Sequence, residues 1–265
     1  MKRLIAVIIV TFFVASIFAQ DRKTAKAERK KEKQDRVNAL IKQEEEGALI
    51  YSKQTSFGLQ LRTNGYGGFV ELGCLKTRRK SNLYTLELTE IKDAKEEKSS
   101  NGFLSFNPYI YAKQNNFYQA KLGFGQQYLL GQKGNKNGVA VLIIYHGGLS
   151  LGLLRPYYLE VEDNGKTRKI KYSQQDSSLF LSTNPDIVKG SAGLGKGWNE
   201  LKLKPGAYAK GAIRFDYGRY NEIVSGIEIG ISVDAYSQKI PIMVFGDPRQ
   251  FFFQGHIAIV FGRRR

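Results

Sequence analysis

The stretch 207–236, AYAKGAIRFDYGRYNEIVSGIEIGISVDAY, contains two alternating segments joined by a short polar turn. In the first segment the apolar Ile213 and Phe215 fall on one face, because neighbouring side chains of a strand point to opposite faces. The opposite face carries Lys210 and Arg214. The second segment alternates in the same way, with isoleucines against acidic residues: Ile227, Ile229 and Ile231 against Glu228 and Asp234. Each apolar band extends over about 9–11 residues, the length of a tilted strand that crosses a bilayer. The hairpin therefore favours a transmembrane β-barrel over a soluble β-sandwich, which alternates similarly.

Composition narrows the classes of function. The chain has 265 residues and a formal net charge of +17, which raises the question of nucleic acid or an anionic membrane surface as a partner. No recognition-helix pattern is present, and the aromatic residues alternate with apolar ones instead of lining a basic face, so we expect no nucleic-acid partner. The single cysteine, Cys74, excludes an internal disulfide, and two histidines leave little material for a zinc site. We therefore expect no metal and no cofactor.

The first 19 residues have the pattern of a secretory signal peptide. Lys2 and Arg3 precede the apolar run 4–18, and Ala19 before Gln20 marks the expected cleavage point. An uncleaved anchor is the alternative, but the run is a little shorter than the roughly 18 residues of a spanning helix. Export also removes the chain from cellular nucleic acid.

The segment 20–47 has a different composition, with charges of both signs and almost no large apolar residues. Such a segment cannot bury a core. Only Val37, Leu40 and Ile41 have helical spacing, so we predict a solvated, partly helical periplasmic segment. A docking helix for a partner protein is the alternative.

The same period-two pattern continues through the remainder of the chain. It predicts six further strands, at 56–63, 66–76, 82–91, 117–130, 139–154 and 251–261. Asn64-Gly65 is a tight-turn signal between the first two. The sequence thus predicts an all-β protein, an eight-stranded antiparallel up-and-down transmembrane barrel at 48–265.

The lengths of the predicted links give the barrel an orientation. With a periplasmic N-terminus, the links after strands two, four and six are short and those after strands three, five and seven are long; only the first external link is short. The short links are 77–81, 131–138 and 218–221, and the long ones are 92–116, 155–206 and 237–250. Short periplasmic turns and longer extracellular loops are typical of outer-membrane barrels.

Outward-facing aromatic residues collect at both ends of the predicted strands. The periplasmic ends carry Phe57, Tyr84, Tyr128, Tyr217 and Phe261. The external ends carry Tyr66, Tyr118, Phe251 and Phe253. Two aromatic girdles at the membrane interfaces are expected of a barrel, whereas a soluble sandwich gives no reason for them.

The signal ending FAQ and the last strand, HIAIVFGRRR, carry a family resemblance. They resemble the small outer-membrane β-barrel proteins of the Bacteroidota, whose chains often end in an apolar strand followed by FG and basic residues. The resemblance implies outer-membrane location and assembly by the barrel insertion machinery, and it implies no activity. The chain departs from many barrels in that three arginines follow Phe261 and Gly262, where those barrels end in an aromatic residue.

The inward faces of the predicted strands carry charges that nearly balance. The basic residues are Arg62, Lys121, Lys210 and Arg214, and the acidic ones are Glu71, Glu87, Asp216, Glu228 and Asp234. Burying any one of them alone is costly, so we predict a paired, hydrogen-bonded lumen network. A substrate or proton path is the alternative.

The candidate catalytic residues are His146 and Ser150, with Glu87 as the carboxylate. The first two share the inward face of one strand, where acyl transfer on lipid A is the reaction that they suggest. Positions four apart in a strand are separated by about 13 Å, so direct pairing requires a break at Gly147-Gly148. We interpret both as ordinary lumen residues.

The predicted external links carry three further signals. The link 155–206 has room for a short hairpin across 162–167 and contains Trp198, the only tryptophan. The link 237–250 holds an apolar run, KIPIMVFG, which either folds over the barrel mouth or meets another protein. At the periplasmic rim, the basic turn 78–80 and the tail 263–265 are placed to meet lipid phosphates.

Three functions remain open. The first is a non-enzymatic structural or adaptor subunit of an envelope complex, which binds a protein partner through its external loops or its N-terminal segment. The second is a lipid-directed enzyme, and the third is a narrow solute pore. Outer-membrane lipid and lipopolysaccharide are expected partners of the barrel wall in each case.

Overall fold

The computed structural model describes residues 31–35, 51–99, 108–134, 138–163, 165–218 and 222–265. The chain divides into two compact units, Met1–Leu49 and Ile50–Arg265. The predicted signal peptide, 1–19, lies outside the described residues. Of the segment 20–47, residues 31–35 are described, and they are helical and exposed. No helix within these described ranges is long and apolar enough to cross a membrane.

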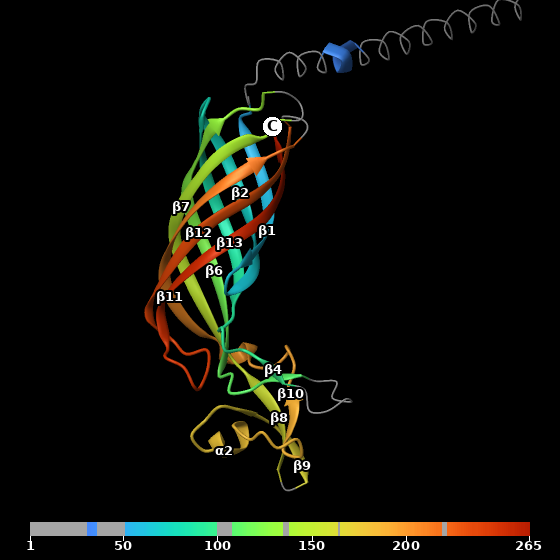
Figure 1. Ribbon diagram of the computed structural model, residues 1–265, viewed down its shortest axis with the longest axis vertical. Coiled ribbons are helices and arrows are strands. Elements are labelled where there is room, and N and C mark those ends of the chain that lie inside the picture. The colour runs from blue at the N-terminus through green and yellow to red at the C-terminus, as the bar shows by residue number, and fades with distance from the viewer. Residues whose placement is uncertain (1–30, 36–50, 100–107, 135–137, 164, 219–221) are drawn as a thin grey trace, which may run out of the picture. The chain divides into compact units, whose positions relative to one another are not determined.

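Eight long strands close into one antiparallel barrel (Figure 1). They are β1 (Lys53–Arg62), β2 (Gly65–Thr77), β3 (Lys80–Ile91), β6 (Asn115–Gly131), β7 (Ala140–Pro156), β11 (Lys202–Asp216), β12 (Ile223–Ile240) and β13 (Arg249–Arg264). Each pairs with the next one along the chain, and β13 closes the ring against β1, where Phe57 lies opposite Phe261. The predicted eight-stranded up-and-down barrel is confirmed.

The outer wall is apolar and the lumen is polar. Leu59, Ile231 and Phe253 on the outside are 74%, 73% and 79% exposed, while their strand neighbours Gln60, Ser232 and Gln254 are buried. An apolar surface that encircles the whole barrel would be unstable in water, and it matches the lipid-facing band of a transmembrane barrel. The alternation of the sequence is therefore an alternation between lipid and lumen.

The aromatic residues expected at the two rims lie on the outer wall. Seven of the nine are exposed: Phe57, Tyr66, Tyr84, Tyr217, Phe251, Phe253 and Phe261. Tyr118 and Tyr128 are half-buried. Tyr118 is covered because Trp198 stacks on it, with 5.8 Å between ring centroids and 18° between planes. Contact of these rings with the membrane interfaces stays a prediction.

Strand ends differ from the predicted ones at the end of the barrel that carries the subdomain. β11 begins at Lys202 and β12 continues to Ile240, so parts of the links predicted at 155–206 and 237–250 belong to the sheet. Pairing with β7 holds to the register Lys202–Leu154. The pattern did not mark these ends, because Pro205 is unusual inside a strand and the run Ser237, Gln238 and Lys239 has no apolar side chain to mark a face.

The first hairpin also differs by one residue. Arg62 pairs with Gly65, so the two-residue turn is Thr63-Asn64 and not Asn64-Gly65. Gly65 is required for another reason, since a Cβ atom there would lie 1.9 Å from the carbonyl oxygen of Glu90 on β3. The glycine allows close approach of β2 and β3 at this rim of the barrel.

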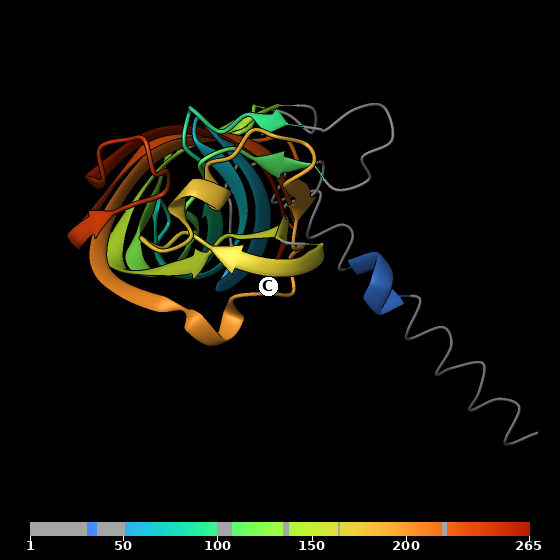
Figure 2. The ribbon, with the colours of Figure 1, turned by 90° about the horizontal axis from the view of Figure 1, so that it is seen from below.

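A small subdomain follows β7 at the end of the barrel opposite the C-terminus (Figures 1 and 2). It contains β8 (Tyr158–Asp163), β9 (Lys166–Lys171), α2 (Ser177–Phe180), β10 (Val188–Ser191) and the 3-10 helix η1 (Trp198–Glu200). The sheet order is β10-β8-β9, and Glu162 pairs with Thr167, which confirms the predicted hairpin. Leu159, Val161, Ile170, Phe180 and Val188, each at most 4% exposed, form its apolar core together with Tyr109 from the link before β6. A second short pair, β4 (Lys98–Ser99) and β5 (Tyr109–Ile110), lies in the link before β6.

The lipid-facing belt predicts a depth-dependent cost for charge. Ile229 lies midway between the girdles, paired with Ile213 and Ile257, so Ile229→Arg should lower the free energy of unfolding by about 2–4 kcal/mol. Leu203→Arg is the matched control, because Leu203 is exposed near the end of β11 that adjoins the subdomain, where the cost falls to about 0–1 kcal/mol. Urea unfolding in lipid vesicles measures both. Equal costs at the two positions would contradict the belt.

Candidate functional site

Ten charged side chains lie buried in the lumen within the described residues. The basic ones are Arg62, Lys121, Lys210, Arg214 and Arg264, and the acidic ones are Glu71, Glu87, Asp216, Glu228 and Asp234. None is more than 7% exposed. Five positive charges therefore face five negative ones. A buried charge is tolerated only when paired, so equal numbers are what a closed lumen requires.

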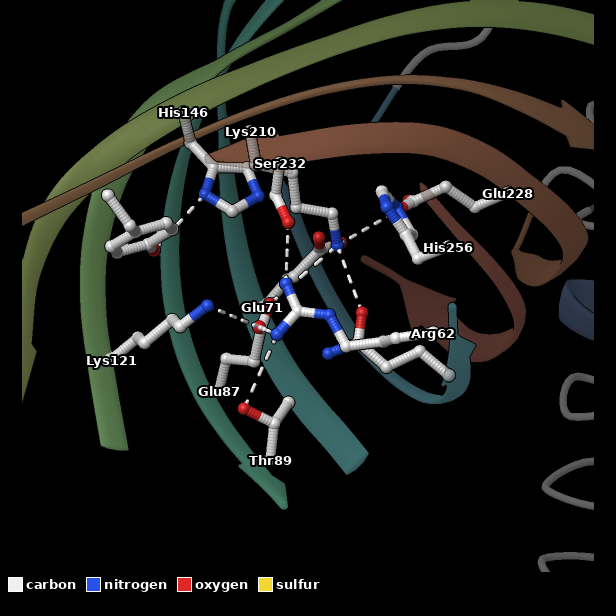
Figure 3. A network of polar contacts seen from close by, with 12 residues as sticks. Arg62, Glu71, Glu87, Thr89, Lys121, His146, Lys210, Glu228, Ser232 and His256 are labelled. Atoms are coloured by element: carbon white, nitrogen blue, oxygen red, sulfur yellow. Dashed lines mark hydrogen bonds and ion pairs between the residues drawn. The ribbon is translucent and has the colours of Figure 1, made fainter. Parts of the chain in front are cut away.

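Glu87 on β3 lies at the centre of the network (Figure 3). Its Oε1 is 3.4 Å from Arg62 on β1 and 3.5 Å from Lys121 on β6, and its Oε2 is 3.7 Å from Lys210 on β11. Lys121 makes a shorter contact of 2.5 Å with Asp234 on β12. One carboxylate thus connects three strands that are far apart around the ring.

A second carboxylate, Glu228 on β12, contacts Arg214, Lys210 and His256. Its Oε2 accepts from Arg214 at 2.6 Å, and its Oε1 is 2.9 Å from Lys210 and 3.2 Å from His256 Nε2. Arg214 also donates to Glu71 on β2 at 2.7 Å. Arg214 therefore bridges opposite sides of the barrel, and His256 serves as a hydrogen-bonded interior residue.

Arg264 completes the charge balance and corrects the interpretation of the C-terminal tail. β13 continues to Arg264, whose side chain turns into the lumen, 2% exposed, and lies 2.5 Å from Asp216. Its Nε also donates to Gln54 at 3.0 Å. Arg264 is thus not placed to meet lipid phosphates, whereas Arg263 and Arg265 are exposed. Continuing the alternation three residues past Phe261, which faces outward, would have predicted this.

Large side chains from other strands fill the space beside the glycines that face the lumen. A Cβ atom on Gly58 would lie 2.4 Å from the ring of Phe69, and one on Gly123 would lie 2.0 Å from the hydroxyl of Tyr208. Both rings extend across the interior, with Lys210 Nζ 4.6 Å from the Phe69 ring centroid. Small and large residues are therefore matched across the lumen, as in other barrels of this width.

The mouth of the barrel on the side of the subdomain is covered by an apolar cluster. Ile240, Ile242 and Met243 are buried against Phe117, Leu154, Tyr236 and Phe252. Lys113 bridges to Met243 and holds this cover to the start of β6. The apolar run at 240–246 was expected either to fold over the barrel mouth or to meet another protein. Its buried part folds over the mouth, while Phe245 is 56% exposed.

The candidate catalytic residues do not assemble into a catalytic set. Nδ1 of His146 lies 3.2 Å from the hydroxyl of Tyr208, and the Oγ of Ser150 lies 2.7 Å from the hydroxyl of Tyr236. Glu87 is engaged by three cations. A nucleophilic serine needs a base within hydrogen-bond reach, and the hydrogen-bond partner of Ser150 is the phenol of Tyr236. Across the described residues, no cluster of three or more His, Cys, Asp or Glu side chains is arranged to hold a metal ion.

A polar cluster lies outside the barrel, between the small sheet and η1. Glu200 accepts from the hydroxyl of Tyr158 at 2.7 Å and from the ammonium of Lys171. The bond from Lys171 holds the pKa of the Glu200 carboxyl below its ordinary value, and the same bond raises the pKa of Lys171. Nothing in the local sequence signalled this cluster, because its members come from three separate elements.

The lumen network predicts a sharp difference between adjacent arginines. Arg264→Met leaves the Asp216 carboxylate with a longer ion pair, 3.7 Å to Lys133, and a hydrogen bond from the Gly218 backbone N–H, and should lower the free energy of unfolding by about 3–5 kcal/mol. Arg263→Met removes a side chain that is 64% exposed and should change it by no more than about 0.5 kcal/mol. The double variant Arg264→Met with Asp216→Leu should recover most of the loss. Urea unfolding of refolded protein tests all three; equal stabilities for the two single variants would rule out the pairing.

Comparisons with known proteins complete the description. No protein-family model and no curated protein sequence matches the chain. Among solved structures, the N-terminal β-barrel domain of Pseudomonas aeruginosa OprF has a TM-score of 0.37 at 8% identity, over 80% of this chain and 98% of that one. Ail, the attachment invasion locus protein of Yersinia pestis, has a TM-score of 0.36 at 6% identity, over 82% and 100%. Neisserial surface protein A has 0.37 at 7%, over 80% and 96%. Identities of this order assign no activity or ligand.

Proposed function

We propose that this protein is an outer-membrane β-barrel that works as a non-enzymatic structural or adaptor subunit of an envelope complex. The observation that carries the proposal is the combination of a filled lumen with a structured external subdomain. The barrel anchors the chain, and the subdomain at 157–201 presents the binding surface. Its apolar cluster supports this division, because a mere connecting loop would not need one; Tyr109 of β5 completes the cluster.

The arrangement of the links supports the proposed orientation. Tyr51 and Arg265, the described ends of this unit, lie at one end of the barrel, where Ser52 and Lys53 bond to Arg265. The short links between β2 and β3, β6 and β7, and β11 and β12 also lie at this end. We assign it to the periplasm and the long links to the outside. Outer-membrane lipid and lipopolysaccharide would then surround the apolar wall, and the barrel insertion machinery would assemble it.

The subdomain can be removed without cutting the barrel, which gives the adaptor proposal a direct test. Leu154 and Lys202 are paired neighbours, so a short Asn-Gly turn can replace 157–200. We expect this variant to keep heat-modifiable gel migration and outer-membrane fractionation, and to lose the crosslinked protein partner that the full chain captures in intact outer membrane. Capture of the same partner by the shortened chain, or of none by the full chain, would contradict the proposal.

The filled lumen predicts an electrically silent barrel. Planar-bilayer recordings of the purified chain should show no steady single-channel conductance, because buried side chains occupy the path. The variant in which a short turn replaces 241–248 should also be silent, since the ion-pair network remains below the removed mouth cover; Ile240 and Arg249 are paired, so the strands can be joined there. Steady conductance through the wild-type chain would favour the pore function instead.

A further inference from the structure

Two cavities adjoin on the external side of the protein. One, of about 480 Å³, lies between the barrel rim at Lys202 and Lys204 and the small sheet at Tyr172. The other, of about 560 Å³, lies between β8, β9 and η1. Glu200 lines both, and its two hydrogen-bond partners are divided between them, with Tyr158 in the second and Lys171 in the first. The two cavities thus share Glu200 in their linings, and we call the neighbouring pair the rim groove.

The rim groove is strongly basic. Six lysines line it, and Glu200 is the single acidic residue among the described residues of its lining. They are Lys171, Lys202, Lys204 and Lys239 in the first cavity and Lys169 and Lys196 in the second. Like charges gathered in one concave site raise the local concentration of an anion.

Most of this charge is not neutralised within the protein. Lys171 pairs with Glu200, and Lys169 lies 2.9 Å from Glu160. Lys204 bonds to Gln238, which is neutral. Within the described part of the chain, no carboxylate lies within ion-pairing distance of Lys202, Lys204 or Lys239. These three ammonium groups are therefore available to a ligand.

The groove also contains a fixed aromatic surface. Trp198 is 48% exposed, yet three contacts hold its ring: the stacked Tyr118, the guanidinium of Arg155 at 4.9 Å, and a bond from its Nε1 to the carbonyl of Leu194 at 2.8 Å. A rigid, half-exposed indole offers a flat apolar surface at little entropic cost. The amide side chains of Gln114 and Asn199 in the lining can both donate to and accept from hydroxyl groups.

We propose that the rim groove binds an anionic carbohydrate, a sugar chain that carries phosphate, sulfate or carboxylate groups. The lysines match the anionic groups, Trp198 matches the apolar face of a sugar ring, and the amides match its hydroxyls. The proposal rests on the proposed function for one point only, that this side of the barrel faces the exterior. Such sugars have two sources there, the lipopolysaccharide of the same membrane and polysaccharide from outside the cell.

The only tryptophan of the chain lies in the groove, so its fluorescence reports on binding directly. Purified full-length protein in detergent is titrated with dextran sulfate, with neutral dextran of the same length as the control ligand. We expect a saturable change of Trp198 emission with dextran sulfate only. The affinity should fall as salt is added, because exposed charges are screened within about 10 Å at 0.1 M salt.

Matched variants separate groove binding from the effect of net charge. Lys202→Gln with Lys204→Gln and Lys239→Gln should weaken binding at least about tenfold, since each charged hydrogen bond contributes more than a neutral one. Lys53→Gln with Lys76→Gln and Lys80→Gln removes the same charge from the opposite end of the barrel, where all three side chains are exposed, and should change affinity less than about twofold. Unshifted heat-modifiable migration shows that both variants are folded.

The outcomes separate this proposal from the adaptor function. Sugar fragments of lipopolysaccharide without their acyl chains form a second arm, and tighter binding of these fragments or of dextran sulfate identifies the source. No emission change with either, or equal loss in both triple variants, overturns the carbohydrate site and leaves the crosslinking test unaffected. Binding that persists when crosslinking finds no partner supports the site while removing the adaptor function.

Discussion

The ion-pair network in the lumen is the constraint on which the other features of this barrel depend. Taking a charge out of water costs several kcal/mol even after relaxation, and only close opposite charges offset it. Glu228 with Arg214 and Lys121 with Glu87 supply such contacts between paired strands. Glu71 with Arg214, and Glu87 with Arg62 and Lys210, supply them between strands that are not neighbours. The network therefore fixes which strands face each other across the lumen, and a shift of one strand by one residue would send its charges into lipid.

A lumen occupied in this way places function outside the barrel. Tyr208, Phe69 and the ion pairs occupy the interior, and Ile242 and Met243 close the mouth. His146 and Ser150 each bind a tyrosine and belong to the same packed interior. We place recognition at the end of the barrel that carries the subdomain, where a second apolar cluster lies beside a groove in which no carboxylate of the described residues pairs with Lys202, Lys204 or Lys239.

How much the sequence predicts depends on the range of the interaction. Alternation between adjacent residues is local, so it predicted the eight strands and the inward position of Glu87, Arg214 and the other lumen charges. The same alternation continues past Phe261 and places Arg264 on the inward face, beyond the predicted strand end at 261. The contacts of Glu200 with Tyr158 and Lys171 could not be predicted, because they join η1, β8 and β9 through pairings that no local pattern encodes.

The distribution of charge along the chain follows from the difference between the lumen and the other parts of the protein. Because five buried cations meet five buried anions, the lumen contributes nothing to the formal net charge of +17. The excess must therefore lie in the parts of the chain outside the lumen. Exposed cations facing solvent repel each other weakly and cost the fold little, since water and salt screen them. The barrel can thus carry a basic groove at its rim without loss of stability, whereas the same lysines placed in the lumen would each require a carboxylate.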